Sequence, residues 1–156
     1  MDNATNPMRG IFHGFDIASS GLRAEMQRSE IVSVNLSNMN SIGNEKDKPY
    51  QRRGVIFEEV LDDAARSSLS GVPGSEGLAT GVRVSQIYAD TLTPFEPLHA
   101  PYHPAANEAG YVLRSNVNMF NELVDMSIIE RSFQANLSAL RSYRNMLQAA
   151  VQNIGR

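Results

Sequence analysis

The chain has 156 residues, 42% of them hydrophobic, with 14 basic and 17 acidic residues and a net charge of −3. This size predicts one domain, with long helical extensions if the helices outgrow a modest core. The balanced charge, without a basic stripe, argues against nucleic-acid binding, and the absence of cysteine excludes disulfides and thiolate metal sites.

The first segment, residues 1–14, is polar and contains several Asn, Pro and Gly residues. It lacks the charged start and apolar run of a Sec signal peptide, so we expect a leader that is disordered or related to export. No stretch of the sequence approaches the roughly 18 apolar residues of a membrane-spanning helix, so no transmembrane segment is expected.

A helix is expected over residues 15–39, because its side chains recur in steps of three and four residues. This spacing forms a narrow seam along one side of a helix, suited to packing on other helices. Turn-forming residues between Asn38 and Asn44 are expected to end the helix, by turns and left-handed caps. The seam positions are Phe15, Ala18, Leu22, Glu25, Ser29, Val32, Leu36 and Met39.

The middle of the chain predicts short strands. Alternating residues favour strands at 50–61, 82–88 and 110–113. Between the first two, residues 62–81 are rich in Ser and Gly and predict a flexible surface loop. Residues 93–104 contain four prolines, which lack an amide donor, so this segment is predicted to be extended and irregular rather than part of a helix or sheet ladder.

A second long helix is expected over residues 118–154, with Asn118 as its N-cap. At about 1.5 Å per residue it would extend about 55 Å, beyond the diameter of about 40 Å of a compact chain of this size. One seam cannot offset the entropy of ordering so long a helix, so we expect both terminal helices to be only partly ordered in the free monomer and to assemble with other subunits. The seam comprises Leu123, Met126, Glu130, Phe133, Leu137, Leu140, Arg144, Leu147, Val151 and Ile154.

Two positions of the C-terminal seam are charged. The alternative reading of both seams is that they are simply the core of one molecule. Glu130 and Arg144 interrupt the apolar seam and are interpreted as register markers or ion-pair partners between subunits. A core explains the apolar positions of both helices. It does not explain the length of the second helix, so the spacing favours assembly.

No catalytic or metal-binding motif is predicted. His99 and His103 have the spacing of a helical histidine pair, but the prolines around them exclude a helix. Glycines at 71–81 are not followed by the Lys-Ser or Lys-Thr of a phosphate-binding loop. No serine belongs to a motif with a histidine and an acid. We therefore expect no enzyme activity, no metal and no cofactor.

Several strings, taken in order, resemble those of flagellar axial proteins. Residues 35–38, Asn-Leu-Ser-Asn, resemble the Asn-Leu-Ala-Asn signature of that family, and residues 131–136, Arg-Ser-Phe-Gln-Ala-Asn, resemble its Arg-x-Tyr-Gln-Ala-Asn signature. Ser37 and Phe133 depart from these signatures, and Ser115 departs from the usual Pro. The ordered set resembles the proximal rod proteins of the bacterial flagellar basal body over about residues 12–154. The intervening strings are Tyr50-Gln51-Arg52, Val55-Ile56-Phe57, Gly81-Val82-Arg83-Val84, His103-Pro104, Gly110-Tyr111-Val112 and Asn116-Val117-Asn118.

The resemblance implies an α+β fold in which long N- and C-terminal helices, 15–39 and 118–154, pair as a coiled-coil-like layer around a small antiparallel β domain, 40–117. It implies a structural subunit that is exported by the flagellar type III apparatus and assembles in the periplasm into the torque-transmitting rod. The implied partners are further copies of the chain, proximal and distal rod proteins, basal-body base components and the export apparatus.

The residues predicted to form the assembly interface lie on the two helices and in the two signatures. They are Phe15, Leu22, Val32, Asn35, Leu36, Asn38, Leu123, Met126, Glu130, Arg131, Phe133, Gln134, Ala135, Asn136, Leu137, Leu140, Arg144, Leu147, Val151 and Ile154.

Three alternatives remain open at the level of sequence. The chain could be another axial subunit of the rod or hook family, and the His103-Pro104 and Gly110–Val112 strings favour the proximal rod type instead. It could be a rod-associated enzyme with His99 and His103 as metal ligands, which metal analysis would test. It could also be a helical adaptor that forms a small oligomer in the cytoplasm.

Overall fold

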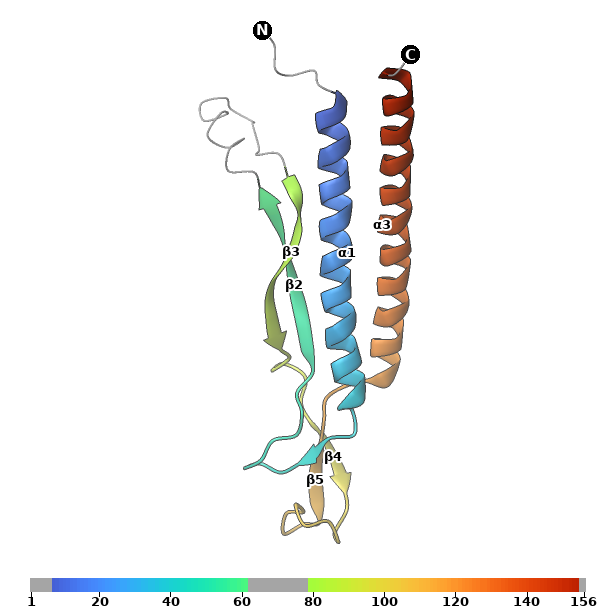
Figure 1. The fold of residues 1–156 in the computed structure, drawn as a ribbon. Helices are drawn as coiled ribbons and strands as arrows, with labels where there is room; N and C mark the ends of the chain where they lie inside the picture. Colours follow the sequence, from blue (N-terminus) through green and yellow to red (C-terminus); the bar gives the residue numbers. More distant parts are fainter. Residues whose placement is uncertain (1–6, 62–78, 155–156) are drawn as a thin grey trace, which may run out of the picture. The chain divides into compact units, whose positions relative to one another are not determined.

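The structure is a computed structural model, and it describes residues 7–61 and 79–154 (Figure 1). It confirms the α+β class: two long helices occur with two small antiparallel sheets. None of the helices in the described part of the chain is long and apolar enough to cross a membrane. In chain order the elements are α1 (Pro7–Ser37), β1 (Ile42–Gly43), β2 (Arg53–Leu61), β3 (Ala79–Ala89), β4 (Glu96–His99), β5 (Tyr111–Arg114) and α3 (Met119–Ile154).

The described residues divide into two compact units, and each long helix contributes to both. The first unit contains residues 7–26, 57–61, 79–85 and 130–154. The second unit contains residues 27–56 and 86–129. Each unit therefore combines a segment of α1 with a segment of α3, and residues from the two ends of the sequence meet in both.

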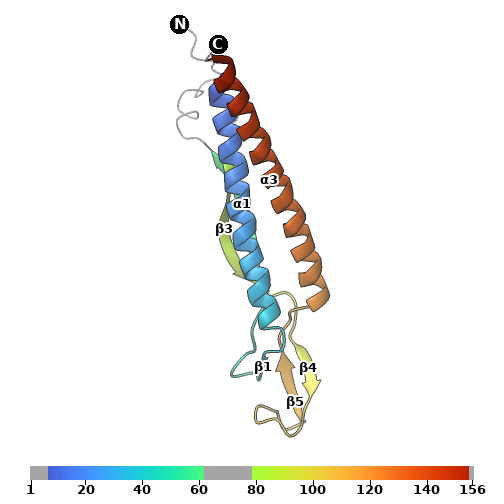
Figure 2. The same cartoon turned by 45° about the vertical axis from the view of Figure 1, so that its right-hand side comes forward.

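In the first unit, α1 and α3 run side by side in opposite directions (Figures 1 and 2). Side chains of α3 lie against two glycines of α1. A Cβ added at Gly14 would lie 2.4 Å from the ring of Tyr143, and one added at Gly21 would lie 2.9 Å from the amide nitrogen of Asn136. The two glycines are seven residues apart, and so are their partners Tyr143 and Asn136.

The other side of this α1 segment contacts the β2–β3 ribbon. The Val82 N–H donates to Ser20 Oγ at 3.0 Å, and Ser20 Oγ donates to the carbonyl of Ile17 at 2.7 Å. The buried residues on α1 here are small, Gly14, Ala18 and Ala24. Small residues allow close backbone approach but bury little apolar area, so the first unit gains little from a core of its own.

The second unit contains a three-stranded antiparallel sheet in the order β1-β5-β4. Leu98 of β4 pairs with Val112 of β5, and Val112 is fully buried. Val32 of α1 and Ile129 of α3 are also buried in this unit. Polar residues share the core with them, so the position of the helices here depends on hydrogen bonds as well as on apolar packing. These buried polar residues are Asn35, Ser115, Asn116 and Glu122.

The helix ends agree only partly with expectation. The prediction that Asn118 caps α3 is confirmed, because its Oδ1 accepts from the N–H groups of Phe120 at 2.9 Å and Asn121 at 3.2 Å. α1 begins at Pro7, so the expected leader is helical from that residue onward. Proline is accepted there because the first turn of a helix does not use its N–H groups.

The C-terminal end of α1 differs from the expected left-handed caps. The helix ends at Ser37, where the Asn38 N–H donates to the carbonyls of Val34 and Asn35, and the Asn38 side-chain amide donates to Val34 at 2.8 Å. No residue other than glycine has a positive φ in the part of the chain that the structure describes. The cap is therefore made by side-chain hydrogen bonding rather than by a left-handed residue.

The strand predictions need three corrections. The strand expected from residue 50 begins at Arg53, because the N–H groups of Tyr50 and Arg52 donate to the side chains of Ser41 and Asn116 instead of to a neighbouring strand. The proline-rich segment contains a strand, β4, because an edge strand bonds on one side only and tolerates Pro97. Most of the loop predicted at 62–81 lies outside the described residues, and its last residues, 79–81, belong to β3.

Candidate functional site

A cluster of buried polar side chains is centred on Asn35 in the second unit. The Asn35 amide nitrogen donates to the carbonyl of Arg53 at 2.8 Å and to Glu122 Oε2 at 3.0 Å. Its Oδ1 accepts from the hydroxyl of Tyr50 at 2.8 Å and from the N–H of Arg53 at 2.9 Å. The side chain is 0% exposed, and its four hydrogen-bonding positions are all occupied.

Glu122 and Asp125 of α3 surround the cationic part of this cluster. Arg52 Nε donates to Glu122 at 2.6 Å, and its Nη2 donates to Asp125 at 3.1 Å. Arg28 of α1 donates to the other oxygen of Asp125 at 3.2 Å. Glu122 is 0% exposed, so a buried carboxylate is held by one cation and one amide. We call Asn35, Arg52, Glu122, Asp125 and Arg28 the polar clasp.

The electrostatics of the clasp follow from its geometry. Burial by itself would lower the pKa of Arg52, but its hydrogen bond to Glu122 and the charges of Glu122 and Asp125 raise the pKa above its usual value. Burial raises the pKa of Tyr50, against a lowering influence of Arg53, so its hydroxyl stays protonated and can donate to Asn35. Both ionisable groups therefore hold the state that the hydrogen bonds require.

A second asparagine, Asn116, joins the clasp to the turn before β4. Its Oδ1 accepts from the N–H of Arg52 at 2.7 Å, and its amide nitrogen donates to the carbonyls of Asp90 and Thr93, each at 3.0 Å. Asp90 in turn accepts from the hydroxyl and N–H of Thr93 and from the N–H of Leu92. These bonds from Thr93 hold the pKa of Asp90 below its usual value.

An exposed apolar stripe, made of Phe120, Val124 and Ile128 with the neighbouring Leu123, runs along the start of α3. Phe120 is 78% exposed and Val124 is 59% exposed. Phe120, Val124 and Ile128 recur every four residues and so share one face of the helix. Large apolar side chains that gather on one exposed face are typical of a surface that another protein covers.

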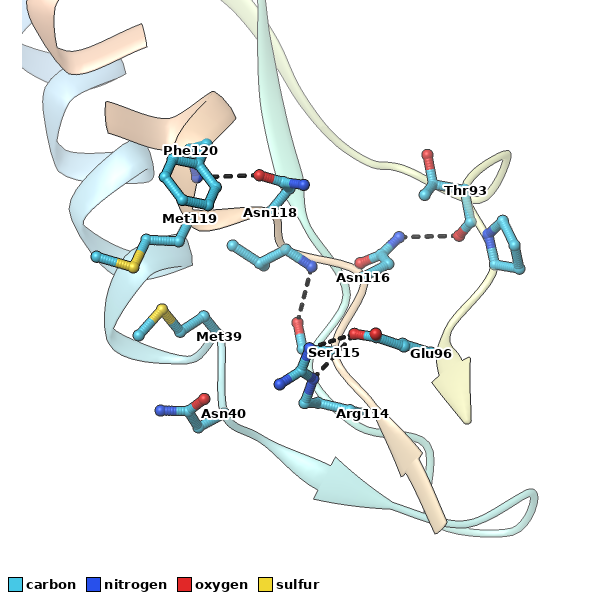
Figure 3. Close-up of a pocket in the computed structure, with 12 residues that line it drawn as sticks. Met39, Asn40, Thr93, Glu96, Arg114, Ser115, Asn116, Asn118, Met119 and Phe120 are labelled. Carbon is cyan, nitrogen blue, oxygen red and sulfur yellow. Dashed lines mark hydrogen bonds and ion pairs between the residues drawn. The ribbon is translucent and has the colours of Figure 1, made fainter. Parts of the chain in front are cut away.

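A surface hollow of about 540 Å³ adjoins the first residue of this stripe (Figure 3). Figure 3 shows Met39, Met119 and Phe120 along one part of the hollow, and the ion pair of Arg114 with Glu96 along another. Nε of Arg114 donates to Glu96 at 3.1 Å. The hollow thus combines apolar side chains with an exposed ion pair.

The structure separates the predicted interface residues into covered and exposed sets. Val32 and Asn35 are buried, and the bonds of Asn35 are internal to the chain, so Asn35 does not lie on an accessible surface. The half-buried residues are Leu22, Leu36, Asn38, Met126, Phe133, Asn136, Leu137, Leu140 and Leu147. The exposed residues are Phe15, Leu123, Glu130, Arg131, Gln134, Ala135, Arg144 and Val151, and the side chain of Ile154 lies outside the description.

The predicted seam of α3 is rotated relative to the face that the chain covers. Leu123 and Val151 are exposed, whereas Ile129 is buried and Tyr143 contacts Gly14. A single sequence shows the spacing of apolar residues, but polar Glu122 and aromatic Tyr143 also occupy covered positions. Glu130, interpreted as a register marker, accepts from Gln134 one turn away at 3.2 Å.

The residues that sequence reasoning missed are Arg28, Glu122 and Asp125 in the clasp, and Phe120, Val124 and Ile128 in the exposed stripe. Arg52 and Asn116 belong to the strings that resemble rod proteins, but the sequence assigned them no role. The clasp partners Arg52 and Glu122 are 70 residues apart, so no local pattern links them. The four-residue spacing of the exposed stripe can be read in the sequence. The predicted seam through Leu123, however, lies on a different face of α3.

The two histidines of the proline-rich segment have structural contacts. The ring of His99 lies 5.0 Å from that of Tyr111, and His103 Nδ1 accepts from the N–H of Ala105 at 3.1 Å. Within residues 7–61 and 79–154, no three His, Asp or Glu side chains gather in a way that could hold a metal ion.

Known proteins are similar to this chain over most of its length. Residues 108–153 match the family described as flagellar basal body rod FlgEFG protein, C-terminal. A flagellar basal-body rod protein FlgC of Bacillus subtilis is 32% identical over 145 residues, which cover 90% of this chain and 96% of that protein. The FlgC protein of Buchnera aphidicola is 35% identical over 135 residues, covering 85% and 90%. That of Borreliella burgdorferi is 30% identical over 148 residues, covering 91% and 96%.

Proposed function

Because this chain belongs to the family of flagellar basal-body rod proteins FlgC, we propose that it is a structural subunit of the flagellar basal-body rod. The observation that carries the proposal is the extent of the similarity, which runs over most of this chain and most of each relative. The similarity therefore includes both long helices and the strands between them, and not one shared segment alone.

The proposal extends to the route and the setting of the subunit. The chain is exported by the flagellar type III apparatus, orders in the periplasm and assembles with further copies, with other proximal and distal rod proteins and with base components. The rod that results transmits torque. Contacts that repeat head to tail without closing a ring produce such a helical tube.

Exposed apolar side chains on both long helices support an assembly role. Phe15 of α1 is exposed, and so are Leu123 and Val151 of α3, with Val151 at 62%. In the rod these residues pack against helices of neighbouring subunits, as a coiled-coil-like layer with seam spacing of three and four residues. Complete burial of such a side chain from full exposure contributes roughly 1.5–3 kcal/mol, and these partly covered side chains contribute less each, once in every subunit.

The test is a set of Asp substitutions on α3, assayed for motility, for isolated rods and for export of the subunit. Leu137→Asp and Leu147→Asp are expected to abolish rod assembly and motility while export stays nearly intact, because an interface cannot accept an unpaired carboxylate. Val151→Asp is expected to do the same without altering the fold of the monomer, since Val151 is exposed. The matched control is Gln152→Asp, at an exposed position beside it.

Two outcomes would contradict the proposal. A motile strain that carries both Leu137→Asp and Leu147→Asp would exclude the α3 seam from the assembly. If Val151→Asp and Gln152→Asp lost motility equally, the loss would be due to the added charge and not to a specific contact of Val151.

A further inference from the structure

Residues 50–53, which we call the strap, bond to the last turns of α1. The hydroxyl of Tyr50 and the N–H of Arg53 both donate to Asn35 Oδ1, at 2.8 and 2.9 Å. The Asn35 amide nitrogen donates back to the carbonyl of Arg53 at 2.8 Å. Three of the four hydrogen bonds of the Asn35 side chain therefore go to the strap.

The same strap bonds to the first turns of α3 through one side chain. Arg52 donates to Glu122 at 2.6 Å and to Asp125 at 3.1 Å, while its backbone N–H donates to Asn116 at 2.7 Å. The guanidinium is the cation nearest to the buried carboxylate of Glu122. Arg52 therefore supplies the charge that makes burial of this carboxylate acceptable.

Three direct polar links join the two helices in the described residues of this unit, and one of them is a weak bond from the Ser29 hydroxyl to the Met126 sulfur at 3.7 Å. Asn35 donates to Glu122 at 3.0 Å, and Arg28 pairs with Asp125 at 3.2 Å at a half-buried position. Without the strap, Glu122 would keep a single amide donor for a fully buried carboxylate, and Asn35 would keep one bond of four. Burying groups in that state opposes pairing of the helices.

We propose that the strap is a conformational lock: residues 27–37 of α1 and 119–129 of α3 pair only when residues 50–53 have docked against both. Helix pairing in this unit then depends on the docked middle segment. This goes beyond the role of the chain in a rod, because it concerns what holds the helices of a single molecule together.

The lock has a consequence for a chain whose two helices lie at opposite ends of the sequence. α1 and α3 each have apolar side chains that could bind a wrong partner before the chain is complete. The buried polar cluster needs groups from α1, the strap and α3. It therefore disfavours such partners, since a foreign helix would leave buried polar groups of the cluster without their hydrogen-bond partners.

The test is hydrogen exchange, measured by mass spectrometry on the full-length chain and its variants. Peptides covering 27–37 and 119–129 report on helix pairing. Arg52→Met keeps most of the length of the side chain but removes its charge. Arg52→Met combined with Glu122→Gln also removes the buried charge while it leaves an amide able to bond Asn35. The matched control is Arg83→Met, which breaks the exposed pair of Arg83 with Glu58 at 3.1 Å.

We expect exchange in both helical segments to be about 100-fold faster in Arg52→Met than in the wild-type chain, from the cost of breaking a buried ion pair. We expect it to remain at least about tenfold faster in the double variant, because the hydrogen bonds from the Arg52 guanidinium to α3 are still missing. Arg83→Met should match the wild type.

Other results would overturn the lock. Protection within about threefold of the wild type in the double variant would show that the single variant fails only because its carboxylate is unpaired. Wild-type helical segments without protection would show that the docked strap does not hold the helices in the free chain. Protection retained in Arg52→Met would show that the helices pair unaided.

Discussion

At the scale of single residues, asparagine side chains make many of the hydrogen bonds that join separate segments of this chain. Asn35 uses both donors and both acceptor positions of one amide, Asn116 joins three backbone segments, and Asn118 caps α3. An apolar residue of similar size at position 35 would leave several buried groups without partners. Buried polar groups of this kind select one arrangement of the chain more than they add stability.

Asp90 provides a prediction at this scale. The bonds from Thr93 lower its pKa in the folded chain, so the folded state favours the carboxylate. The resulting stabilisation is fully present above the usual pKa of 3.8 and is lost as the pH falls through the lower folded value. In thermal unfolding, the wild-type chain should exceed Asp90→Asn in stability at neutral pH, and the difference should shrink as the pH falls below 3.8.

The control for this titration is Asp16→Asn, at an exposed position on α1. A difference between the wild type and Asp90→Asn that is the same at all pH values would show that the bonds from Thr93 do not depend on the charge of Asp90.

At the scale of elements, the two long helices approach through glycine rather than through a continuous apolar seam. The ring of Tyr143 lies against Gly14, and the side chain of Asn136 lies against Gly21. Each glycine lowers the helix propensity of α1. Its presence in the helix is explained by the α3 side chain that occupies the place of a Cβ.

The sign of the stability change caused by Gly14→Ala therefore shows whether α1 and α3 are paired at this position. In an unpaired helix the substitution should stabilise by roughly 1 kcal/mol through helix propensity. In the paired helices the new Cβ would meet the Tyr143 ring at 2.4 Å, and overpacking should destabilise by roughly 1–3 kcal/mol. We expect a lower midpoint of thermal unfolding, followed by far-ultraviolet circular dichroism.

The control is to make Gly14→Ala in a chain that already carries Tyr143→Ala, which lacks the ring. In that chain Gly14→Ala should be stabilising. If the substitution stabilises the chain equally with and without the ring, the helices are not paired at this position in the free protein.

At the scale of the whole molecule, the buried side chains are distributed unevenly between the two units. Among the described residues, the largest fully buried side chains are Glu122, Val112 and Asn35, and all three belong to the second unit. The first unit buries mainly small residues and exposes Met26, Met146 and Val151. The free energy that holds the free chain folded should therefore come mostly from the second unit.

Hydrogen exchange on the wild-type chain tests this distribution. Residues 27–56 and 86–129 should exchange slowly, and residues 14–26 and 130–154 should exchange fast, because their helices lack a core of their own. The boundary of order would then fall inside both long helices. Equal protection along α1 and α3 would contradict this expectation and would mean that the terminal helices order without other subunits.

The sequence by itself determined the elements that depend on local chemistry. Spacing in steps of three and four predicted both long helices, Asn118 predicted the start of α3, and alternation predicted the strands around Val55, Val82 and Val112. Signature strings in order predicted the family, because they are short, local and readable in one chain. The assembly interface remains a prediction.

Only the tertiary structure decided which side chains meet. Arg52 and Glu122 are 70 residues apart, and each is an ordinary charged residue until the fold buries the carboxylate. The covered face of α3 likewise depends on what α1 presents, since Gly14 makes a space that Tyr143 enters. Local patterns report the periodicity of one segment, whereas burial and pairing depend on the partner, and the partner is set by folding of the whole chain.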